Sequence, residues 1–348
     1  MTQSTDQQSR SFGIGIDFGT TNSAAALFDG KKVHLLKLEK NSVVMPSATY
    51  INNEFKIITG EKAIEQYIES NTGRTVEFSA EILGEARTTT GQIGDHGLPE
   101  EANTRKLYGQ SFIDGSQKGR LFRGTKRVLG NNEAPRLIVF NRPFRLVAFI
   151  TPLLLRIRKS IDKHLRLLET NAEFTNHTCV GHPINFEGSG PHRNQHALKL
   201  LSEAYTHAGF SEQYYYPEPI AAALSYLYEN PLATDQTLLA VDFGGGTLDL
   251  CLLKREKKEF SVIATHGIEL GGDYIDQILF RKLVFPLLGK GERWRRAGED
   301  REIETVFPFH EYEDLLLNWA VSYILNPVSY THLRAHETLR YRVLRSML

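Results

Sequence analysis

The chain has 348 residues, with 41 basic and 41 acidic side chains and a formal net charge of zero. This length is typical of two domains, or of one large domain with lobes. A hydrophobic content of 41% and a charged content of 24% are ordinary for a soluble globular protein. Because the net charge is zero, no global field points to nucleic acid or a membrane as the partner.

The N-terminus and the cysteines favour a cytoplasmic location. The first ten residues, MTQSTDQQSR, are polar and do not resemble a secretory signal, so we expect residues 1–11 to form a disordered leader. The longest apolar run, Leu146–Ile157, is too short to span a bilayer. Cys179 and Cys251 lie in apolar, strand-like stretches, which favours buried thiols in a reducing compartment over disulfides.

A stretch near the N-terminus, GIGIDFGTTNSAAALF, spans Gly13–Phe28. Its apolar residues predict a strand that ends near Asp17, then a turn of small side chains, then a second strand. The stretch LLAVDFGGGTLDLCLL, Leu238–Leu253, repeats this pattern around Asp242. A single turn of this kind is usually just the tip of a hairpin. Two near-copies with matching Asp, Gly and Thr favour a shared function instead.

Turns made of glycine and threonine suit the binding of phosphate. Glycine allows positive φ and lets another group approach the main chain closely, and successive N–H groups of such a turn form a concave anion site. An aspartate beside the turn would repel phosphate unless a cation lies between them, and Mg²⁺ prefers carboxylates, waters and phosphate oxygens. Two such hairpins facing each other would clamp a polyphosphate. Neither copy contains the G-x-x-x-x-G-K-[ST] pattern of a P-loop.

Seven short segments, in chain order, resemble one family. GIDFGTTNS and VDFGGGTLD look like the two phosphate motifs of the actin-like ATPase superfamily, and more narrowly those of the seventy-kilodalton heat-shock chaperones (DnaK-like). Further similar segments are RGTKRVLG (Arg123–Gly130), PEPIAAALSY (Pro217–Tyr226) and ELGGDYID (Glu269–Asp276). GHPINFEG (Gly181–Gly188) and FPLLGKG (Phe285–Gly291) resemble the divergent YegD-type members of the family.

The resemblance implies a role for each matching residue. Asp17 and Asp242 would hold Mg²⁺ through waters. Glu218 would orient the attacking water or accept its proton, supported by Asp249 and Thr247. The phosphates of ATP or ADP would be lined by Gly19, Thr20, Thr21, Asn22, Gly244, Gly245, Gly246, Thr247, Gly271 and Gly272. The implied reaction is phosphoryl transfer to water, which depends mostly on positioning and charge stabilisation.

Glu218 also has a purely structural interpretation. It precedes Pro219 at the start of an alanine-rich segment, where an acidic residue suits the helix dipole. Its catalytic role therefore depends on the two phosphate motifs.

The resemblance also implies a catalytic lysine, expected in a G-x-A-A-K segment. The nearest match is TGEKAIEQY, Thr59–Tyr67. When the segments are aligned on Gly60 and Ala63, the position of the lysine holds Ile64. Lys62 lies two places earlier and would otherwise be an ordinary exposed helix residue. The hypothesis that follows is that the protein binds ATP but hydrolyses it slowly.

The implied fold is α/β, the actin-like ATPase (ribonuclease H-like) fold, with two lobes around a nucleotide cleft and the second lobe incomplete. The first lobe would cover residues 12–234, with a variable subdomain at about 46–141. A partial second lobe would cover residues 235–326. Apolar residues at helical spacing predict a long amphipathic helix over residues 146–169.

The end of the chain does not resemble the family. The core of residues 327–348, VSYTHLRAHET, resembles a peptide produced when sequencing-adapter DNA is translated. We therefore expect a non-native tail on a chain that is truncated inside the second lobe and lacks a peptide-binding domain. A genuine amphipathic tail is the alternative.

The function that the resemblance implies is that of the ATP-binding, ATP-hydrolysing domain of a DnaK-like chaperone. Unfolded polypeptides and co-chaperones would bind through regions that this chain lacks, and neither nucleic acid nor a membrane is an expected partner. Three alternatives stay open. A sugar kinase of the actin superfamily would use ATP faster with a polyol, and a filament protein would scatter light when nucleotide is added. A non-catalytic nucleotide-binding scaffold would bind ATP while both it and a Glu218→Ala variant stay inactive.

Overall fold

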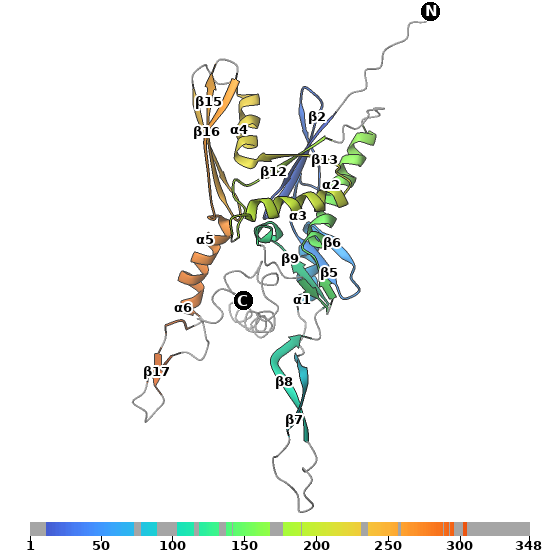
Figure 1. Cartoon of the computed structure of the whole chain (residues 1–348), viewed down its shortest axis with the longest axis vertical. Coiled ribbons are helices and arrows are strands. Elements are labelled where there is room, and N and C mark those ends of the chain that lie inside the picture. The colour runs from blue at the N-terminus through green and yellow to red at the C-terminus, as the bar shows by residue number, and fades with distance from the viewer. Residues whose placement is uncertain are drawn as a thin grey trace, which may run out of the picture.

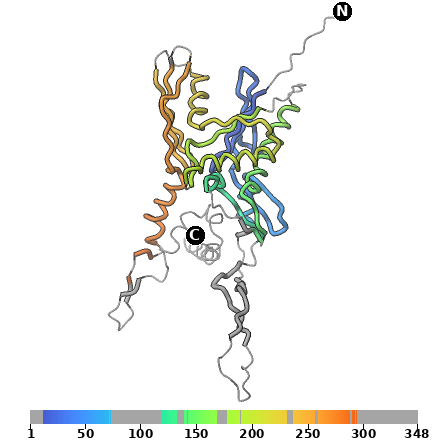
Figure 2. Tube along the Cα trace, in the orientation of Figure 1, coloured from blue at the N-terminus to red at the C-terminus, as the bar shows by residue number. Residues whose placement is uncertain are grey.

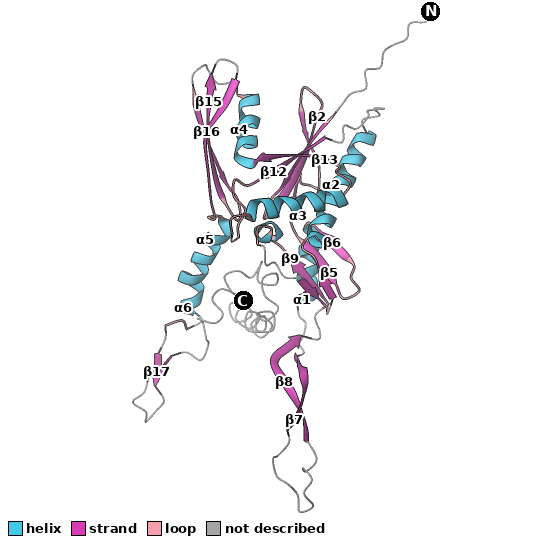
Figure 3. Ribbon diagram, in the orientation of Figure 1, coloured by secondary structure: helices cyan, strands magenta, loops and turns pink. Residues whose placement is uncertain are grey.

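The computed structural model describes residues 12–72, 78–88, 103–114, 118–131, 137–140, 142–167, 177–188, 190–230, 236–256, 259–287, 289–291, 293–295 and 302–304. Helices are interspersed with several separate sheets (Figure 3), which confirms the expected mixed α/β class. Among these residues, no helix combines the length and the apolar character needed to cross a membrane. The predictions for the leader and the tail fall on residues 1–11 and 327–348, outside the described ranges.

The largest sheet has six strands and joins segments that are far apart in the chain. Its members are β1 (Gly13–Phe18), β2 (Asn22–Phe28), β3 (Val33–Leu35), β4 (Val44–Pro46), β12 (His177–His182) and β13 (Glu212–Pro217). The order is β13-β12-β1-β2-β3, and β4 pairs with β2. β1, β12 and β13 run parallel, whereas β2 is antiparallel to β1. Figure 2 shows the blue N-terminal strands beside the later green and yellow segments.

Alternation of buried and accessible residues explains the first hairpin. The buried positions are Ile14, Ile16 and Phe18 in β1 and Ser23, Ala25 and Leu27 in β2. This period of two is that of strands that pack one face on a core. Asp17 points to the opposite face and lies across from Ala24 in the hairpin. The hairpin predicted around Asp17 is therefore confirmed.

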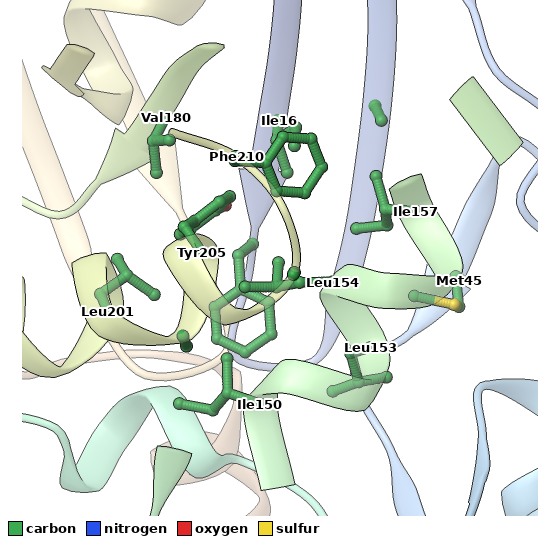
Figure 4. Close-up of a cluster of buried hydrophobic side chains, with 14 of the residues drawn as sticks. Ile16, Met45, Ile150, Leu153, Leu154, Ile157, Val180, Leu201, Tyr205 and Phe210 are labelled. Atoms are coloured by element: carbon green, nitrogen blue, oxygen red, sulfur yellow. The ribbon is translucent and has the colours of Figure 1, made fainter. Parts of the chain in front are cut away.

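Two helices, α2 (Val147–Leu167) and α3 (Arg193–His207), pack against each other and share one core with the six-stranded sheet. The predicted helix over 146–169 is confirmed in α2, and Leu168 lies outside the described residues. Apolar side chains recur every three or four residues along α2, so one stripe faces the core. This stripe is Val147, Phe149, Ile150, Leu153, Leu154, Ile157, Ile161 and Leu165. Figure 4 shows part of it beside Leu201 and Tyr205 of α3.

A smaller sheet contacts helix α2. It has the order β6-β5-β9, with β5 (Thr49–Asn52), β6 (Ile57–Thr59) and β9 (Gly119–Phe122), and α1 (Glu61–Asn71) packs on it. A 3-10 turn, η1 (Thr125–Val128), follows β9 closely. Two further hairpins are β7 (Phe78–Thr88) with β8 (Asn103–Asp114), and β10 (Leu137–Val139) with β11 (Arg142–Phe144). We call the six-stranded sheet, the sheet β6-β5-β9, α1 to α3 and η1 the N-terminal lobe.

A third sheet is antiparallel and continuous in sequence. It consists of β14 (Thr237–Phe243), β15 (Leu248–Glu256) and β16 (Glu259–Ile268). After it come α5 (Gly272–Leu279), a π-helical turn η2 (Phe280–Val284), α6 (Phe285–Leu287) and the hairpin β17 (Arg293–Arg295) with β18 (Glu302–Glu304). We call β14 to β16 with α5 the C-terminal lobe.

Helix α4 (Glu218–Glu229) connects the two lobes. It leaves the end of β13 and packs on β14 and β15, where Ala223 is buried with Cys251 and Leu253. Figure 1 shows α4 between β15 and β16 on one side and the sheet of β2 and β13 on the other.

One expectation about the cysteines is wrong. Cys251 is buried, but Cys179 is exposed, and both are free thiols. In β12, Thr178 and Val180 are buried. Because neighbouring side chains in a strand point to opposite faces, Cys179 must turn away from that core.

We predict that Leu154→Ala lowers the free energy of unfolding by about 2–5 kcal/mol, because it leaves a cavity in a packed core. Leu154 is completely buried, whereas the neighbouring Leu155 is 41% exposed. The matched control Leu155→Ala should change this free energy by less than about 1 kcal/mol. Urea denaturation followed by circular dichroism measures both. Equal effects of the two substitutions would contradict the assigned core face of α2.

Candidate active site

Three parallel strands bring two carboxylates to one edge of the six-stranded sheet. Asp17 lies near the carboxyl end of β1, and Glu218 follows directly on the last residue of β13. Parallel strands end at the same edge, so these side chains meet although they are far apart in sequence. A Cβ atom on Gly181 would lie 3.1 Å from Glu218 Cγ. The glycine in β12 therefore leaves room for the glutamate.

A buried lysine joins these carboxylates. Lys126, in η1, donates a hydrogen bond from Nζ to Glu218 Oε1 within an ion pair. The side chains of Lys126 and Glu218 are 6% and 17% exposed. Burial alone would lower the pKa of Lys126, but the charges of Glu218 and Asp17 outweigh it and raise that pKa. Lys126 is therefore held as a cation among anions.

This position differs from the one expected for a lysine at the site. Lys62 is exposed on α1, which packs on the small sheet, whereas Lys126 contacts Glu218. Lys126 comes from RGTKRVLG, and 92 positions separate it from Glu218. No local pattern reveals this contact, because it arises only when β9 leads into η1 beside the edge of the large sheet. A lysine is therefore present at the site, and slow hydrolysis of ATP stays a prediction.

The first turn, residues 19–22, is held by a serine that the sequence analysis missed. Ser47 is 2% exposed. Its N–H donates to Thr21 O at 2.8 Å, and its hydroxyl donates to Gly19 O at 2.8 Å. Ser47 Oγ also lies 2.8 Å from Ser23 Oγ. These contacts fix the carbonyl groups of the turn, while Thr20 and Thr21 stay half-buried and Asn22 is exposed.

The second turn, residues 244–247, faces the first. A Cβ atom on Gly245 would lie only 2.3 Å from Thr21 Oγ1 and 3.6 Å from Thr20 Cβ. The second turn is closed by a hydrogen bond from Gly244 N–H to Thr247 O at 2.9 Å. The prediction that the two hairpins face each other is confirmed.

The glycines of the two turns allow the opposing main chains to approach closely, and they do not adopt unusual backbone angles. Although glycine allows positive φ, none of Gly19, Gly244, Gly245 and Gly246 adopts it. Any side chain at Gly245 would collide with the opposite turn.

Asp249 and Thr247 form a linked pair at the base of the second turn. Asp249 is 1% exposed, and its Oδ2 accepts a hydrogen bond from the Thr247 hydroxyl at 2.9 Å. Its Oδ1 accepts one from the N–H of Ile184, in the N-terminal lobe, at 3.1 Å. Burial raises the pKa of Asp249, while these two hydrogen bonds act to lower it. The carboxylate thus orients Thr247 and connects the lobes.

Negative charge accumulates around Asp17 and Asp242. Asp17 opens onto the cleft, but protein surrounds most of its carboxylate, and this burial raises the pKa of Asp17 to about 6. The charge of Lys126 acts against this rise, and those of Glu218 and Asp242 add to it. Burial also raises the pKa of Asp242, and the charge of Glu218 adds to this effect. A further cation at this place would relieve the repulsion among the carboxylates.

The donor set suits a hydrated cation. Within the described part of the chain, no three His, Cys, Asp or Glu side chains converge to hold a metal ion directly. A cation beside Asp17 and Asp242 would therefore keep several water ligands, as Mg²⁺ usually does.

Gly271 and Gly272 lie behind the second turn. A Cβ atom on Gly271 would lie 2.3 Å from Gly245 O. Gly272 N–H donates to Gly244 O at 3.0 Å, and Asp273 N–H donates to Gly245 O at 2.9 Å. The start of α5 therefore supports the second turn from the side opposite the first turn, and these two N–H groups are engaged within the protein.

Comparison with known proteins finds similarity to one family. Residues 194–288 match the family described as Hsp70 protein. This range includes Glu218, the second turn and the start of α5. Over this range the chain is similar to Hsp70 proteins. Its α/β architecture with several sheets is consistent with the actin-like ATPase fold of Hsp70 proteins.

Individual Hsp70 relatives align over most of this chain. A chaperone protein HscA homolog from Rickettsia typhi is 27% identical over 306 residues, covering 86% of this chain and 43% of that protein. The mitochondrial heat shock 70 kDa protein of Solanum tuberosum is 27% identical over 304 residues, covering 84% of this chain and 38% of that protein. The chain thus spans about two fifths of the length of the curated relatives it matches.

The raised pKa of Asp17 generates a prediction about stability and pH. Its folded-state pKa of about 6 exceeds the ordinary value of 3.8, so ionising Asp17 costs stability as pH rises between these values. In buffer with a chelator, Asp17→Asn should therefore unfold at higher urea than wild type at pH 7. At about pH 4 the two proteins should unfold at nearly the same urea concentration.

Asp29 provides the matched control. Hydrogen bonds from His34, Lys32 N–H and Lys31 N–H lower the pKa of Asp29, so its ionised form stabilises the fold above about pH 4. Asp29→Asn should therefore be less stable than wild type at pH 7, the opposite sign to Asp17→Asn. A loss of stability in Asp17→Asn at pH 7 would contradict the assigned environment of Asp17.

Proposed function

We propose that this chain binds ATP or ADP with Mg²⁺ and hydrolyses ATP, as the nucleotide-binding domain of a chaperone. The observation that carries the proposal is the close approach of Gly245 to Thr21, with Lys126 and Glu218 at the same cleft. Two small-residue turns that face each other offer main-chain N–H groups and hydroxyls from both sides. A polyphosphate is the ligand whose charge and length suit them.

The residues of the cleft would divide the work of phosphoryl transfer. Lys126 would stabilise negative charge on the transferred phosphoryl group, because the neighbouring carboxylates raise its pKa despite its burial and keep it protonated. Glu218 would orient the attacking water and accept its proton while the bond between the terminal phosphorus and ADP breaks. Asp249 would hold Thr247 in place through its hydrogen bond.

Asp17 and Asp242 would hold Mg²⁺ through water molecules. When bound, the ion supplies positive charge that neutralises phosphate oxygens. The first turn (Gly19, Thr20, Thr21 and Asn22) and the second turn (Gly244 to Thr247) would line the phosphates. Gly271 and Gly272 would act by supporting the second turn, since Gly272 N–H is bonded to Gly244 O.

The larger organisation follows from the same proposal. We propose a first lobe over residues 12–234, with a variable subdomain at about 46–141, and a second lobe that begins at 235. The segments Gly181–Gly188 and Phe285–Gly291 support a YegD-type member of the family.

Client polypeptides and co-chaperones are the proposed partners, and two free thiols support a cytoplasmic location.

We predict that Glu218→Gln keeps MgATP binding but lowers the rate of a single turnover by about 10²–10⁴-fold, because no base accepts the proton of water. Rapid-quench measurement of one turnover, with binding measured by fluorescent nucleotide, tests this. Glu203→Gln is the matched control, because it alters an exposed ion pair with Arg145 and should leave the rate unchanged. If wild type and Glu218→Gln bind ATP and neither hydrolyses it, the chain is a non-catalytic scaffold.

A second prediction concerns the metal. Asp242→Asn should raise the Mg²⁺ concentration needed for half-maximal ATP binding about tenfold or more, because it removes one of two carboxylates near the ion. Asp276→Asn, an exposed position on α5, is the control. Titration of Mg²⁺ at fixed nucleotide measures both variants. Equal Mg²⁺ requirements in Asp242→Asn and wild type would contradict the proposed role of Asp242 in holding the metal ion.

A further inference from the structure

An arginine next to Lys126 bridges the two lobes. Arg127 Nε lies 3.0 Å and 2.8 Å from the two carboxylate oxygens of Glu187, in the N-terminal lobe. Its Nη1 donates to Asp273 Oδ2, in α5 of the C-terminal lobe, at 3.1 Å. The side chains of Arg127 and Glu187 are 18% and 14% exposed. One guanidinium therefore binds carboxylates from both lobes, and we call these three residues the Arg127 bridge.

The Arg127 bridge lies directly against the second turn. A Cβ atom on Gly246 would lie 2.2 Å from Glu187 Oε1 and 3.3 Å from Arg127 Cγ. Asp273 also contributes its main chain, because its N–H donates to Gly245 O at 2.9 Å. The bridge thus touches the turn at Gly246 through side chains and at Gly245 through the backbone.

The position of Arg127 in η1 connects this support with the rest of the cleft. Its neighbour Lys126 pairs with Glu218 at the edge of the large sheet. Of two adjacent residues in η1, Lys126 therefore binds Glu218, and Arg127 binds the two carboxylates that contact the second turn. A guanidinium can bind two carboxylates at once in a fixed planar fork, which an ammonium cannot do in the same geometry.

We propose that Arg127 is a positioning residue, which fixes the second turn relative to Lys126 and Glu218 by binding Glu187 and Asp273 together. The catalytic importance of this role rests on the proposed function. The inference goes further by naming a residue outside the phosphate turns that sets their spacing.

The charges around Glu187 make the bridge sensitive to pH. Three charged groups face Glu187. They are Arg127 in η1, Asp273 in α5, and Glu269 in the segment between β16 and α5. Burial raises the pKa of Glu187 to about 7, and Glu269 and Asp273 add to the rise while Arg127 opposes it. The carboxylate of Glu187 is therefore protonated as pH falls through 7, and the bridge weakens as the pH decreases.

Amide hydrogen exchange in nucleotide-free protein tests the bridge. The reporters are the N–H groups of Gly272 and Asp273, which bind the carbonyls of the second turn. In Arg127→Gln their protection factors should fall about tenfold or more, in line with loss of hydrogen bonds to a charged group. MgATP affinity should fall with them. Arg127→Lys keeps the charge without the fork and should also lose protection.

A second ion pair between the lobes supplies the control. Arg193 Nη1 lies 3.2 Å from Glu269 Oε1, and this pair joins α3 to the segment before α5. At pH 8 or above, where Glu187 is mostly ionised in both proteins, Glu269→Gln should leave the protection of Gly272 and Asp273 within about twofold of wild type. Wild-type protection factors should decrease below pH 7, and Glu187→Gln should remove this dependence.

The outcomes separate the two proposals. Unchanged protection in both Arg127→Gln and Arg127→Lys, or an equal loss in Glu269→Gln, would overturn the positioning role. Wild-type protein that binds no MgATP would overturn the proposed function, while the exchange pattern would still decide whether Arg127 holds the turn.

Discussion

Lys126 is buried among carboxylates, and the arrangement of the cleft depends on its ion pair with Glu218. Removing either charge would leave the other buried without its partner, which typically costs about 3–5 kcal/mol. The pair therefore holds η1, the end of β13 and the start of α4 in fixed relative positions. Asp17, at the end of β1, is drawn into the same group by charge. Two strand ends, the start of one helix and one turn are thus connected by a single ammonium group.

Close approach of main chains is the second constraint. The second turn is enclosed by Thr21 of the first turn, by Glu187 at Gly246, and by the start of α5 behind it. Each contact requires a residue without a side chain. The turn is therefore built of glycine, as a site that binds phosphate through its main chain requires.

The sequence was sufficient for features that depend on local order. Alternation in β1 and β2, the apolar stripe of α2 and the recurrence of the Asp-Phe-Gly turn could all be predicted, because each copy of each pattern lies within one or two dozen residues. Lys126, Ser47 and Glu187 could not be located in this way. Their partners are Glu218, Gly19 and Arg127, and these contacts form only after separate strands have joined one sheet.

The same distinction explains one wrong expectation and the role of the glycines. The turns need small residues for space and not for backbone angle. The apolar character of its strand predicts a buried Cys179. The strand alternates, and this position falls on the outer face.

The contact between Asp249 and Ile184 has a consequence for hydration. Both oxygens of Asp249 are occupied while the lobes are together, one by Ile184 N–H and the other by Thr247. If the lobes separate, the first bond breaks and leaves a buried acceptor without a donor, which is costly unless water replaces the lost N–H. Separation of the lobes and entry of solvent to the base of the second turn are therefore one event. A backbone amide of the N-terminal lobe thus satisfies a buried carboxylate of the C-terminal lobe only while the lobes are in contact.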